Sequence, residues 1–304
     1  MDEFDLIRRY FTGRGARRAD VALGVGDDAA VLAPPPGHEL LLTTDTLVGG
    51  RHFPEQDFPP EAVGHRALAV NLSDIAAMGG VPAWALLALT LPEVDESWLA
   101  AFADGFAALA ERFEVALVGG NMARGPLAIT VTVAGFAAAG SATTRDGARA
   151  EDALWVTGAL GGGAAGLRAL SAGESVDAPA VAAYARPEPR LAAGRALAPR
   201  AHAAIDISDG LLGDLAKLLA ASGGLGAELD RKALPLAPGA TLADALGSSD
   251  DYELLVAAPE SKTETLAASR VLDSAFTRIG RVVAEPGIRL DGESVNGRGY
   301  RHFA

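Results

Sequence analysis

Short acidic motifs within apolar segments constrain this chain more than any other feature of its sequence. They stand beside glycine, serine or threonine at expected strand ends and turns: GDDAA at 26–30, TTDT at 43–46, NLSD at 71–74, DISDG at 206–210 and SSDDYEL at 248–254. A charged side chain is rarely buried without a partner, and Asp74 has no Lys or Arg within a helical turn. The recurrence favours oxygen-coordinated Mg²⁺ over the simpler interpretation, in which each Asp only caps a turn or a helix.

Helical and strand-like segments are mixed along the chain rather than strictly alternating, which predicts an α+β fold. Two domains are expected from the length, and the charged turn RDGARAED suggests a boundary that divides the chain into 1–144 and 145–304. Helices are expected over 2–11, 61–78, 96–113, 162–171, 188–198 and 209–222. Strands are expected over 28–33, 39–44, 85–92, 115–121, 127–136, 153–158, 203–208, 252–258 and 277–283.

A glycine-rich stretch, GALGGGAAG, lies between an expected strand and an expected helix. Its Gly161-x-Gly163-x-x-Gly166 spacing matches the dinucleotide-binding pattern. No second apolar strand ending in an acid follows at the expected distance, so a tight or phosphate-facing turn is favoured. The chain also lacks a G-x-x-x-x-G-K-[ST] loop, so the phosphates of a bound nucleotide would be held through metal ions and arginine.

Charge and composition exclude several classes of protein. The 39 acidic and 26 basic residues leave a net charge of −13, which repels nucleic acid and anionic membranes, and neither is expected as a partner. The absence of cysteine excludes zinc–thiolate sites, iron–sulfur clusters and thiol nucleophiles. No segment is apolar enough to span a membrane and the N-terminus lacks a signal-peptide pattern, so a cytoplasmic protein is expected. The histidines suggest no Ser-His-Asp triad.

In chain order, GDDAA, TTDTLVGGRHF, NLSDIAAMGG, VGGN, SDGL, DDYELL and the terminal GYRHF resemble the thiamine-monophosphate kinase family. That family belongs to the aminoimidazole ribonucleotide synthetase superfamily. The resemblance implies two α+β domains of that type, an N-terminal ATP- and metal-binding domain whose strands join a partner's in a homodimer, and a C-terminal α+β domain. It also implies ATP-dependent phosphorylation of thiamine monophosphate to thiamine diphosphate by direct in-line transfer, assisted by several Mg²⁺ ions.

The resemblance also assigns roles to individual residues. Metal ions would be held by Asp28, Thr43, Thr44, Asp45, Asp74, Asn121, Asp206 and Asp209. ATP would contact Gly120, Asn121, Arg145 and Ser208. Thiamine monophosphate would contact His52, Asp250 and Tyr300. The acceptor is a phosphate oxygen that is already ionised at neutral pH, so no side chain need act as acid or base, and Arg145 would balance the charge of the phosphates.

Three positions depart from the family pattern. Asn121 stands where the family commonly has an aspartate, so a neutral oxygen replaces a carboxylate. SSDDYEL replaces the usual GGEDYEL, which shortens an acid at Asp250. Ala103 replaces a tyrosine that is often found near the nucleotide.

Three other functions stay open at the level of the sequence. Aminoimidazole ribonucleotide synthetase is the nearest enzymatic alternative, because selenophosphate synthetase and the hydrogenase-maturation relative use a cysteine or selenocysteine, neither of which is present here. A metal- or nucleotide-binding regulator of the same fold is the second, although the retained acids argue against it. A nicotinamide-dependent oxidoreductase rests only on the glycine-rich stretch. Within GDD, Asp28 is the expected ligand, while Asp27 is expected to support the turn or lie behind the ligands.

Overall fold

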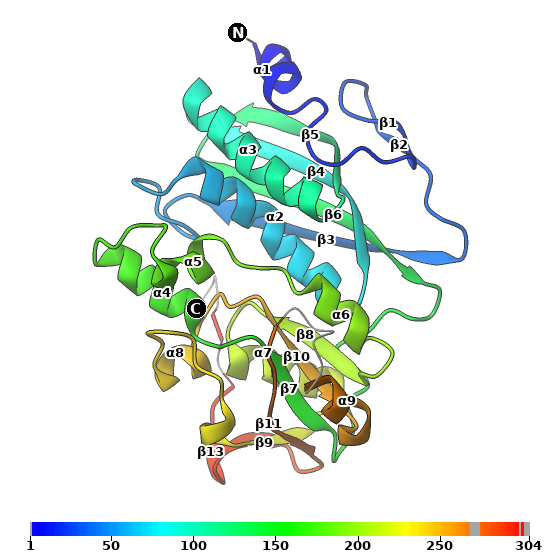
Figure 1. Cartoon of the computed structure of the whole chain (residues 1–304), viewed down its shortest axis with the longest axis vertical. Helices are drawn as coiled ribbons and strands as arrows, with labels where there is room; N and C mark the ends of the chain where they lie inside the picture. Colours follow the sequence, from blue (N-terminus) through cyan, green and yellow to red (C-terminus); the bar gives the residue numbers. More distant parts are fainter. Residues whose placement is uncertain (1, 268–273, 298, 301–304) are drawn as a thin grey trace. The chain divides into compact units, whose positions relative to one another are not determined.

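A computed structural model of the chain describes residues 2–267, 274–297 and 299–300. The chain divides into two compact units, one comprising Met1–Ile75 and Val81–Gly140 and the other Ala76–Gly80 and Ser141–Ala304 (Figure 1). The first unit contains a four-stranded sheet and a two-stranded hairpin, and the second a seven-stranded sheet. Both units combine sheet with helices, so the α+β expectation is confirmed. No helix in these ranges has the length and apolar content needed to cross a membrane.

The helices and strands follow one another in this order along the first part of the chain: α1 (Glu3–Tyr10), β1 (Val21–Leu23), β2 (Val31–Leu32), β3 (His38–Val48), α2 (Pro60–Ala77), β4 (Val81–Leu91), α3 (Glu96–Arg112), β5 (Ala116–Arg124) and β6 (Ala128–Ala138). The order continues with β7 (Ala153–Thr157), α4 (Gly162–Ser171), α5 (Pro179–Ala185), α6 (Leu191–Leu197), β8 (Ala203–Ile207), α7 (Leu211–Ala221), β9 (Gly226–Leu229), the 3₁₀ helix η1 (Arg231–Ala233), α8 (Leu242–Leu246), β10 (Glu253–Ala258), α9 (Glu260–Ala267), β11 (Phe276–Val283), β12 (Gly287–Leu290) and β13 (Glu293–Val295).

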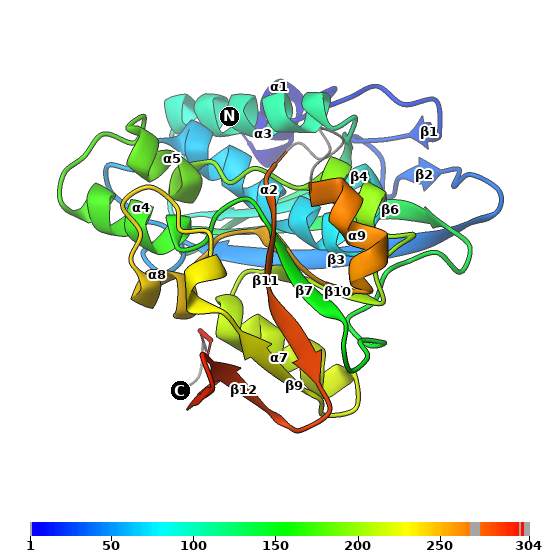
Figure 2. The ribbon, with the colours of Figure 1, turned by 60° about the horizontal axis from the view of Figure 1, so that its bottom comes forward.

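The sheet of the first unit has the strand order β3-β6-β4-β5, with β4 and β5 parallel and the other pairs antiparallel. Helices α2 and α3 lie side by side over one face (Figures 1 and 2). Along β6, Ile129, Val131 and Val133 are fully buried, whereas the residues between them are only half-buried. Because strand side chains alternate between faces, the buried set points toward the helices and the other set lies on the opposite face. That face is open except where Trp84 and Phe136 pack with the β1–β2 hairpin.

Helices α2 and α3 approach each other backbone to backbone. A Cβ atom at Gly64 of α2 would lie 2.1 Å from the Phe102 carbonyl oxygen, and one at Gly105 of α3 would lie 2.0 Å from the Glu61 carbonyl oxygen. Only glycine leaves room for this contact. The two helices match the ranges expected from the sequence, 61–78 and 96–113, to within a residue at each end.

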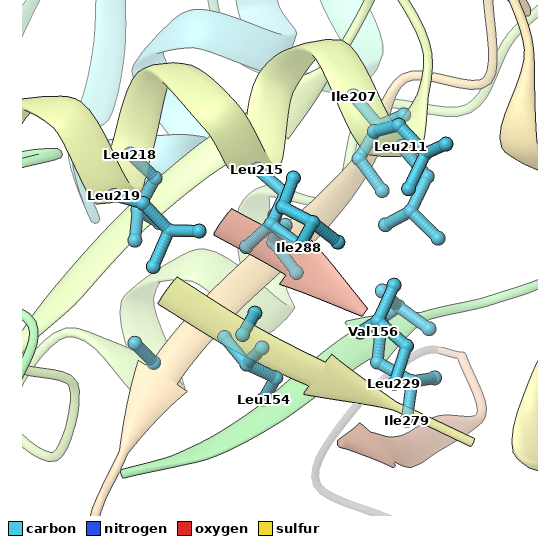
Figure 3. Packing of buried hydrophobic residues seen from close by; sticks show 14 of the residues in the cluster. Leu154, Val156, Ile207, Leu211, Leu215, Leu218, Leu219, Leu229, Ile279 and Ile288 are labelled. Atoms are coloured by element: carbon cyan, nitrogen blue, oxygen red, sulfur yellow. The ribbon is translucent and has the colours of Figure 1, made fainter. Parts of the chain in front are cut away.

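The sheet of the second unit has the strand order β13-β12-β9-β11-β7-β10-β8 and is antiparallel except for the β12–β9 pair. Helix α7 packs its leucines onto one face of this sheet (Figure 3). Leu211, Leu215 and Leu218 are fully buried, as are Leu154 and Val156 of β7 beneath them. This core fixes α7, and therefore the turn that precedes it, relative to strand β8.

Three expectations about elements are wrong. The strand expected over 28–33 is only Val31–Leu32, because residues 24–30 form a loop in which Gly26 has a φ of +120°. The TTDT motif lies inside β3 rather than at a strand end, since β-branched threonines favour strands and β3 pairs with β6 along its whole length. The helix expected over 188–198 begins only at Leu191, after prolines at 187 and 189 that disfavour helix in the residues before them.

We expect the substitution Gly64→Ala to destabilise the protein by about 1–3 kcal/mol, because its methyl group would force α2 and α3 apart. Urea denaturation followed by circular dichroism measures the change. Gly24→Ala is the matched control, because a Cβ there meets only Val21 Cγ1, at 3.7 Å, and equal losses in the two variants would contradict the packing argument.

Candidate active site

Thr43 and Asp74 connect strand β3 to helix α2. The Thr43 hydroxyl donates a hydrogen bond to the Asp74 carboxylate. Thr43 pairs with Val133 and Asp45 with Val131. Both valines are fully buried, so Thr43 and Asp45 lie on the face of the sheet that α2 covers. Three oxygen-bearing side chains from two of the acidic motifs are therefore on one side of β3.

Thr44 points to the opposite face. Its hydroxyl oxygen lies 3.0 Å from that of Thr132 and donates to the Val131 carbonyl oxygen at 3.2 Å. The Thr44 side chain is thus separated from Asp74 by the sheet itself. If Thr44 serves a metal ion beside Asp45, its main-chain carbonyl oxygen must do so.

The GDD motif forms the loop between β1 and β2. The Asp27 carboxylate accepts a hydrogen bond of 2.8 Å from the Asp28 N–H, so Asp27 supports the turn, as the sequence suggests. Both side chains are exposed. Ahead of the hairpin, Asp20 accepts from Trp84 Nε1 at 3.1 Å and pairs with Arg18, and these bonds hold the pKa of Asp20 below its usual value.

Gly120 and Asn121 lie on β5, at the other edge of the sheet from β3. Gly120 has a φ of +155°, and a Cβ atom there would lie 1.8 Å from the Leu87 carbonyl oxygen, so no other residue fits. Asn121 pairs with Ala88 and is exposed. This backbone conformation, which glycine adopts readily, precedes the exposed amide side chain of Asn121 at this edge.

His52 and Arg145 lie in loops. His52 Nδ1 accepts a hydrogen bond of 2.9 Å from the Val48 N–H. This bond places the ring proton on Nε2, which makes the Nε2–H a donor suited to an anion. The Arg145 side chain is exposed, while its carbonyl oxygen accepts from the Ser222 hydroxyl at 3.3 Å.

In the second unit, the DISDG motif ends strand β8 and leads into α7. Asp206 is buried within β8, and Ser208 and Asp209 are half-buried in the turn. The Tyr300 N–H donates to the Asp209 carbonyl oxygen at 3.1 Å, so the structure brings these two expected site residues together. The remainder of GYRHF, residues 301–303, lies outside the described residues.

Asp251 of the SSDDYEL motif is held by backbone and side-chain donors. Asp251 accepts hydrogen bonds from the N–H groups of Gly161 at 2.8 Å and Gly163 at 3.1 Å, and from the Ser249 hydroxyl at 2.7 Å. Burial raises the pKa of Asp251, and these bonds oppose that rise. The chain's own carboxylate therefore occupies the anion position at the start of α4. A dinucleotide phosphate has no place there, which removes the basis of the oxidoreductase alternative.

A mostly buried ion pair follows at the start of strand β10. Glu253 of β10 accepts hydrogen bonds from Arg190 Nε at 2.7 Å and Nη2 at 2.6 Å, and from the Thr157 hydroxyl at 2.6 Å. In the sequence, this glutamate stands out only as part of the DDYELL motif. Its partners lie 63 and 96 residues away, so no local pattern indicates them.

The donor chemistry fits Mg²⁺. In the described ranges, no three acidic or histidine side chains converge on one metal position. Mg²⁺ commonly binds through one or two carboxylates and completes its octahedron with water and substrate phosphates. The set of Thr43, Asp45 and Asp74 contains two carboxylates and one hydroxyl on one face, which suits such a site.

Two family models match the chain. Residues 26–137 match the N-terminal domain of AIR synthase related proteins, and residues 149–293 match their C-terminal domain. The fold and the paired domains thus define a protein of the AIR synthase related class.

Sequence relatives are more specific. The thiamine-monophosphate kinase of Salmonella typhimurium is 44% identical to this chain over 99% of the chain and 98% of the relative. The crystal structure of thiamine-monophosphate kinase from Stenotrophomonas maltophilia K279a has a TM-score of 0.84 at 41% identity, covering 92% of this chain and 93% of that one. AaThiL complexed with AMPPCP and TMP has a TM-score of 0.81 at 34% identity, covering 89% of each chain. The chain belongs to the thiamine-monophosphate kinase family and is an enzyme.

The contacts of Asp251 allow a test. We expect Asp251→Ala to destabilise the protein by about 1–3 kcal/mol, because it leaves the amides at the start of α4 without an acceptor. Asp104→Ala, which removes an exposed acid paired with Arg14, should cost clearly less stability, and thermal melts of both variants measure the difference. Equal losses would show that Asp251 does not hold this loop.

Proposed function

We propose that this chain transfers the γ-phosphoryl group of ATP to thiamine monophosphate and releases ADP and thiamine diphosphate. The observation that carries the proposal is the similarity along the whole chain, with the acidic motifs in order, to thiamine-monophosphate kinases. AaThiL, which is 34% identical, has been solved with both AMPPCP and TMP. That pair of ligands is what a kinase with this substrate would bind.

In the proposed reaction, a phosphate oxygen of thiamine monophosphate attacks the γ-phosphorus in line. The bond from that phosphorus to the oxygen bridging to the β-phosphate breaks as the new bond forms. The attacking oxygen is ionised at neutral pH, so no proton is removed. The chain therefore has to align two phosphate groups and offset their negative charge. Arg145, with its exposed guanidinium, would supply positive charge to the ATP phosphates.

Bound Mg²⁺ would neutralise the phosphates and so reconcile an enzyme of net charge −13 with polyanionic substrates. In the first unit, the side chains of Asp28, Thr43, Asp45, Asp74 and Asn121 and the Thr44 carbonyl oxygen would hold the ions. In the second unit, Asp206 and Asp209 would do so. The hydrogen bond between Thr43 and Asp74 supports this assignment, because it holds two of these donors together.

The remaining assigned residues would bind the organic substrates. Gly120, which is exposed on β5, would contact the nucleotide through its backbone, and Asn121 and Ser208 would contact it beside Arg145. His52 would donate its Nε2–H to thiamine monophosphate, and Asp250 and Tyr300 would line the same substrate. Of the proposed domains, 1–144 would carry ATP and metal binding and dimerisation, and 145–304 would form the C-terminal α+β domain.

The reaction itself is the first test. With Mg²⁺-ATP and thiamine monophosphate, we expect ADP and thiamine diphosphate in equal amounts, loss of turnover with a chelator, and recovery with Mg²⁺. Asp45→Ala should lower turnover about 100-fold or more, because an oxygen donor aimed at the reacting charge is lost. Asp104→Ala, which removes an exposed acid paired with Arg14, is the control. Turnover of formylglycinamidine ribonucleotide instead would overturn the proposal.

We also propose that the open face of the first unit's sheet binds a second copy of the chain. Leu42 on β3 is 66% exposed and Leu86 on β4 is 44% exposed. Leu86 pairs with Thr132, which pairs with Thr44, so one row of this face is formed by a leucine and two threonines. A large exposed apolar area on a sheet indicates an interaction surface, and the family resemblance makes a homodimer the expected occupant.

We expect Leu42→Asp to convert a dimer into a monomer, because a charge would be buried without a partner in the interface. Size-exclusion chromatography with light scattering measures the mass. Phe4→Asp changes an apolar residue that is 63% exposed on α1 and should leave the dimer intact. A wild-type chain that is monomeric at micromolar concentration would contradict this interface.

A further inference from the structure

Asp214 makes three hydrogen bonds that neither the resemblance nor the proposed reaction assigns. It lies in α7 and is almost completely buried, with 1% exposure. Its Oδ2 accepts from three consecutive backbone N–H groups, those of Ser208 at 3.1 Å, Asp209 at 2.9 Å and Gly210 at 3.1 Å. One carboxylate oxygen therefore holds the turn that carries two proposed site residues, Ser208 and Asp209.

The turn depends on this carboxylate. The N-cap residue of α7 is Gly210, which has no side chain to cap the helix. Gly210 has a φ of +108°, and a Cβ atom there would lie 1.8 Å from the Gly247 carbonyl oxygen. The backbone thus turns all three amides inward within a tightly packed position. A buried amide without an acceptor costs free energy, so the turn keeps this shape only while Asp214 accepts from it.

The other oxygen of Asp214 has a separate partner. Lys217 Nζ lies 2.8 Å from Asp214 Oδ1 and also forms an ion pair with the Asp209 carboxylate. Lys217 is 43% exposed, so this contact lies toward the surface while the amide contacts lie inside. Asp209 is consequently held at its backbone by Asp214 and at its side chain by Lys217.

We propose that Asp214 is a positioning residue that sets the affinity of the Asp206–Asp209 turn for divalent ions. This inference rests on the proposed function. Asp214 touches no substrate; it acts by fixing the backbone from which Ser208 and Asp209 extend and that directly follows Asp206. Substituting a residue that orients metal ligands typically lowers metal affinity about 10- to 100-fold.

The same geometry constrains nucleotide binding. Three convergent amides before a helix are a typical anion site. Here the anion is the chain's own carboxylate, so these amides are not open to a phosphate. Any contact between Ser208 and ATP must therefore come from its hydroxyl group or its carbonyl oxygen.

The test measures Mn²⁺ binding to the full chain by electron paramagnetic resonance in the presence of AMPPCP. Asp214→Asn keeps the size of the side chain but loses its charge, and it should weaken Mn²⁺ binding about 10- to 100-fold. Amide hydrogen exchange at 208–210 should become faster in the same variant. Asp152→Asn is the matched control, because Asp152 is also buried and accepts from the Arg149 N–H at 2.8 Å. It should lower the melting temperature while Mn²⁺ binding stays at the wild-type level.

A merely structural role would lower the melting temperature of Asp214→Asn and leave Mn²⁺ binding unchanged, which would overturn the inference. A wild-type chain that binds no Mn²⁺ would overturn it as well. If Asp214→Asn does not fold, Asp214→Glu is used, because it keeps the charge but displaces the carboxylate oxygens. Its Mn²⁺ affinity should lie between that of the wild type and that of a ligand variant such as Asp206→Asn. Wild-type Mn²⁺ affinity together with unprotected amides in Asp214→Glu would contradict the role of the turn.

Lys217→Met separates the two contacts of Asp214. It should keep the amides protected and bind Mn²⁺ at least as tightly as the wild type, because it removes a positive charge beside Asp209. A tenfold loss would instead assign the effect to Lys217. These readouts involve no thiamine phosphate, so absent turnover with normal Mn²⁺ behaviour would reject the proposed substrate and leave this inference standing.

Discussion

Carboxylates that accept hydrogen bonds from backbone amides hold the loops on which the candidate site depends. Asp27 accepts from Asp28, Asp251 from two glycines at the start of α4, and Asp214 from three residues of the turn before α7. Asp27 and Asp251 belong to acidic motifs, and Asp214 follows the DISDG motif in α7. The acids of this chain therefore include aspartates that shape the backbone as well as those proposed as ligands.

This division explains why the acids occur beside glycines. Folding several amides onto one carboxylate requires backbone angles that most residues avoid. Gly161 and Gly210 have φ values of +81° and +108°, and both lie at helix starts where their N–H groups donate to a carboxylate. A sequence such as SDG is thus a unit of structure as well as a possible ligand set. The charge of Asp214, which holds this turn, is balanced by amide dipoles and by Lys217.

The sequence predicts long periodic elements well and isolated contacts poorly. Helices α2 and α3 and the pattern of mixed strands follow from local apolar periodicity, so the fold class was accessible. The expected strand over 28–33 is wrong because Gly26 turns the backbone at a φ of +120° and the Asp27 side chain accepts from the Asp28 N–H. The acids of the motifs are visible in the sequence as candidates. The role of Asp251 is not, because its glycine donors lie 88 and 90 residues away. The donors of Asp214 lie close in sequence, but the turn that points them at its carboxylate depends on the packing of α7.

Strand register limits how the oxygen donors of the first unit can be combined. Asp45 lies on the edge strand β3 and on the face that α2 covers, whereas Asn121 lies on the opposite edge strand and pairs with Ala88, which lies in a row with Thr130 and Thr46 on the open face. Three strand spacings of about 4.8 Å separate the two edges by about 14 Å. A Mg²⁺ ion reaches its ligands at about 2.1 Å, so one ion cannot join Asp45 to Asn121 of the same chain. If both residues bind metal, at least two ions are required, and the phosphates between them provide the link.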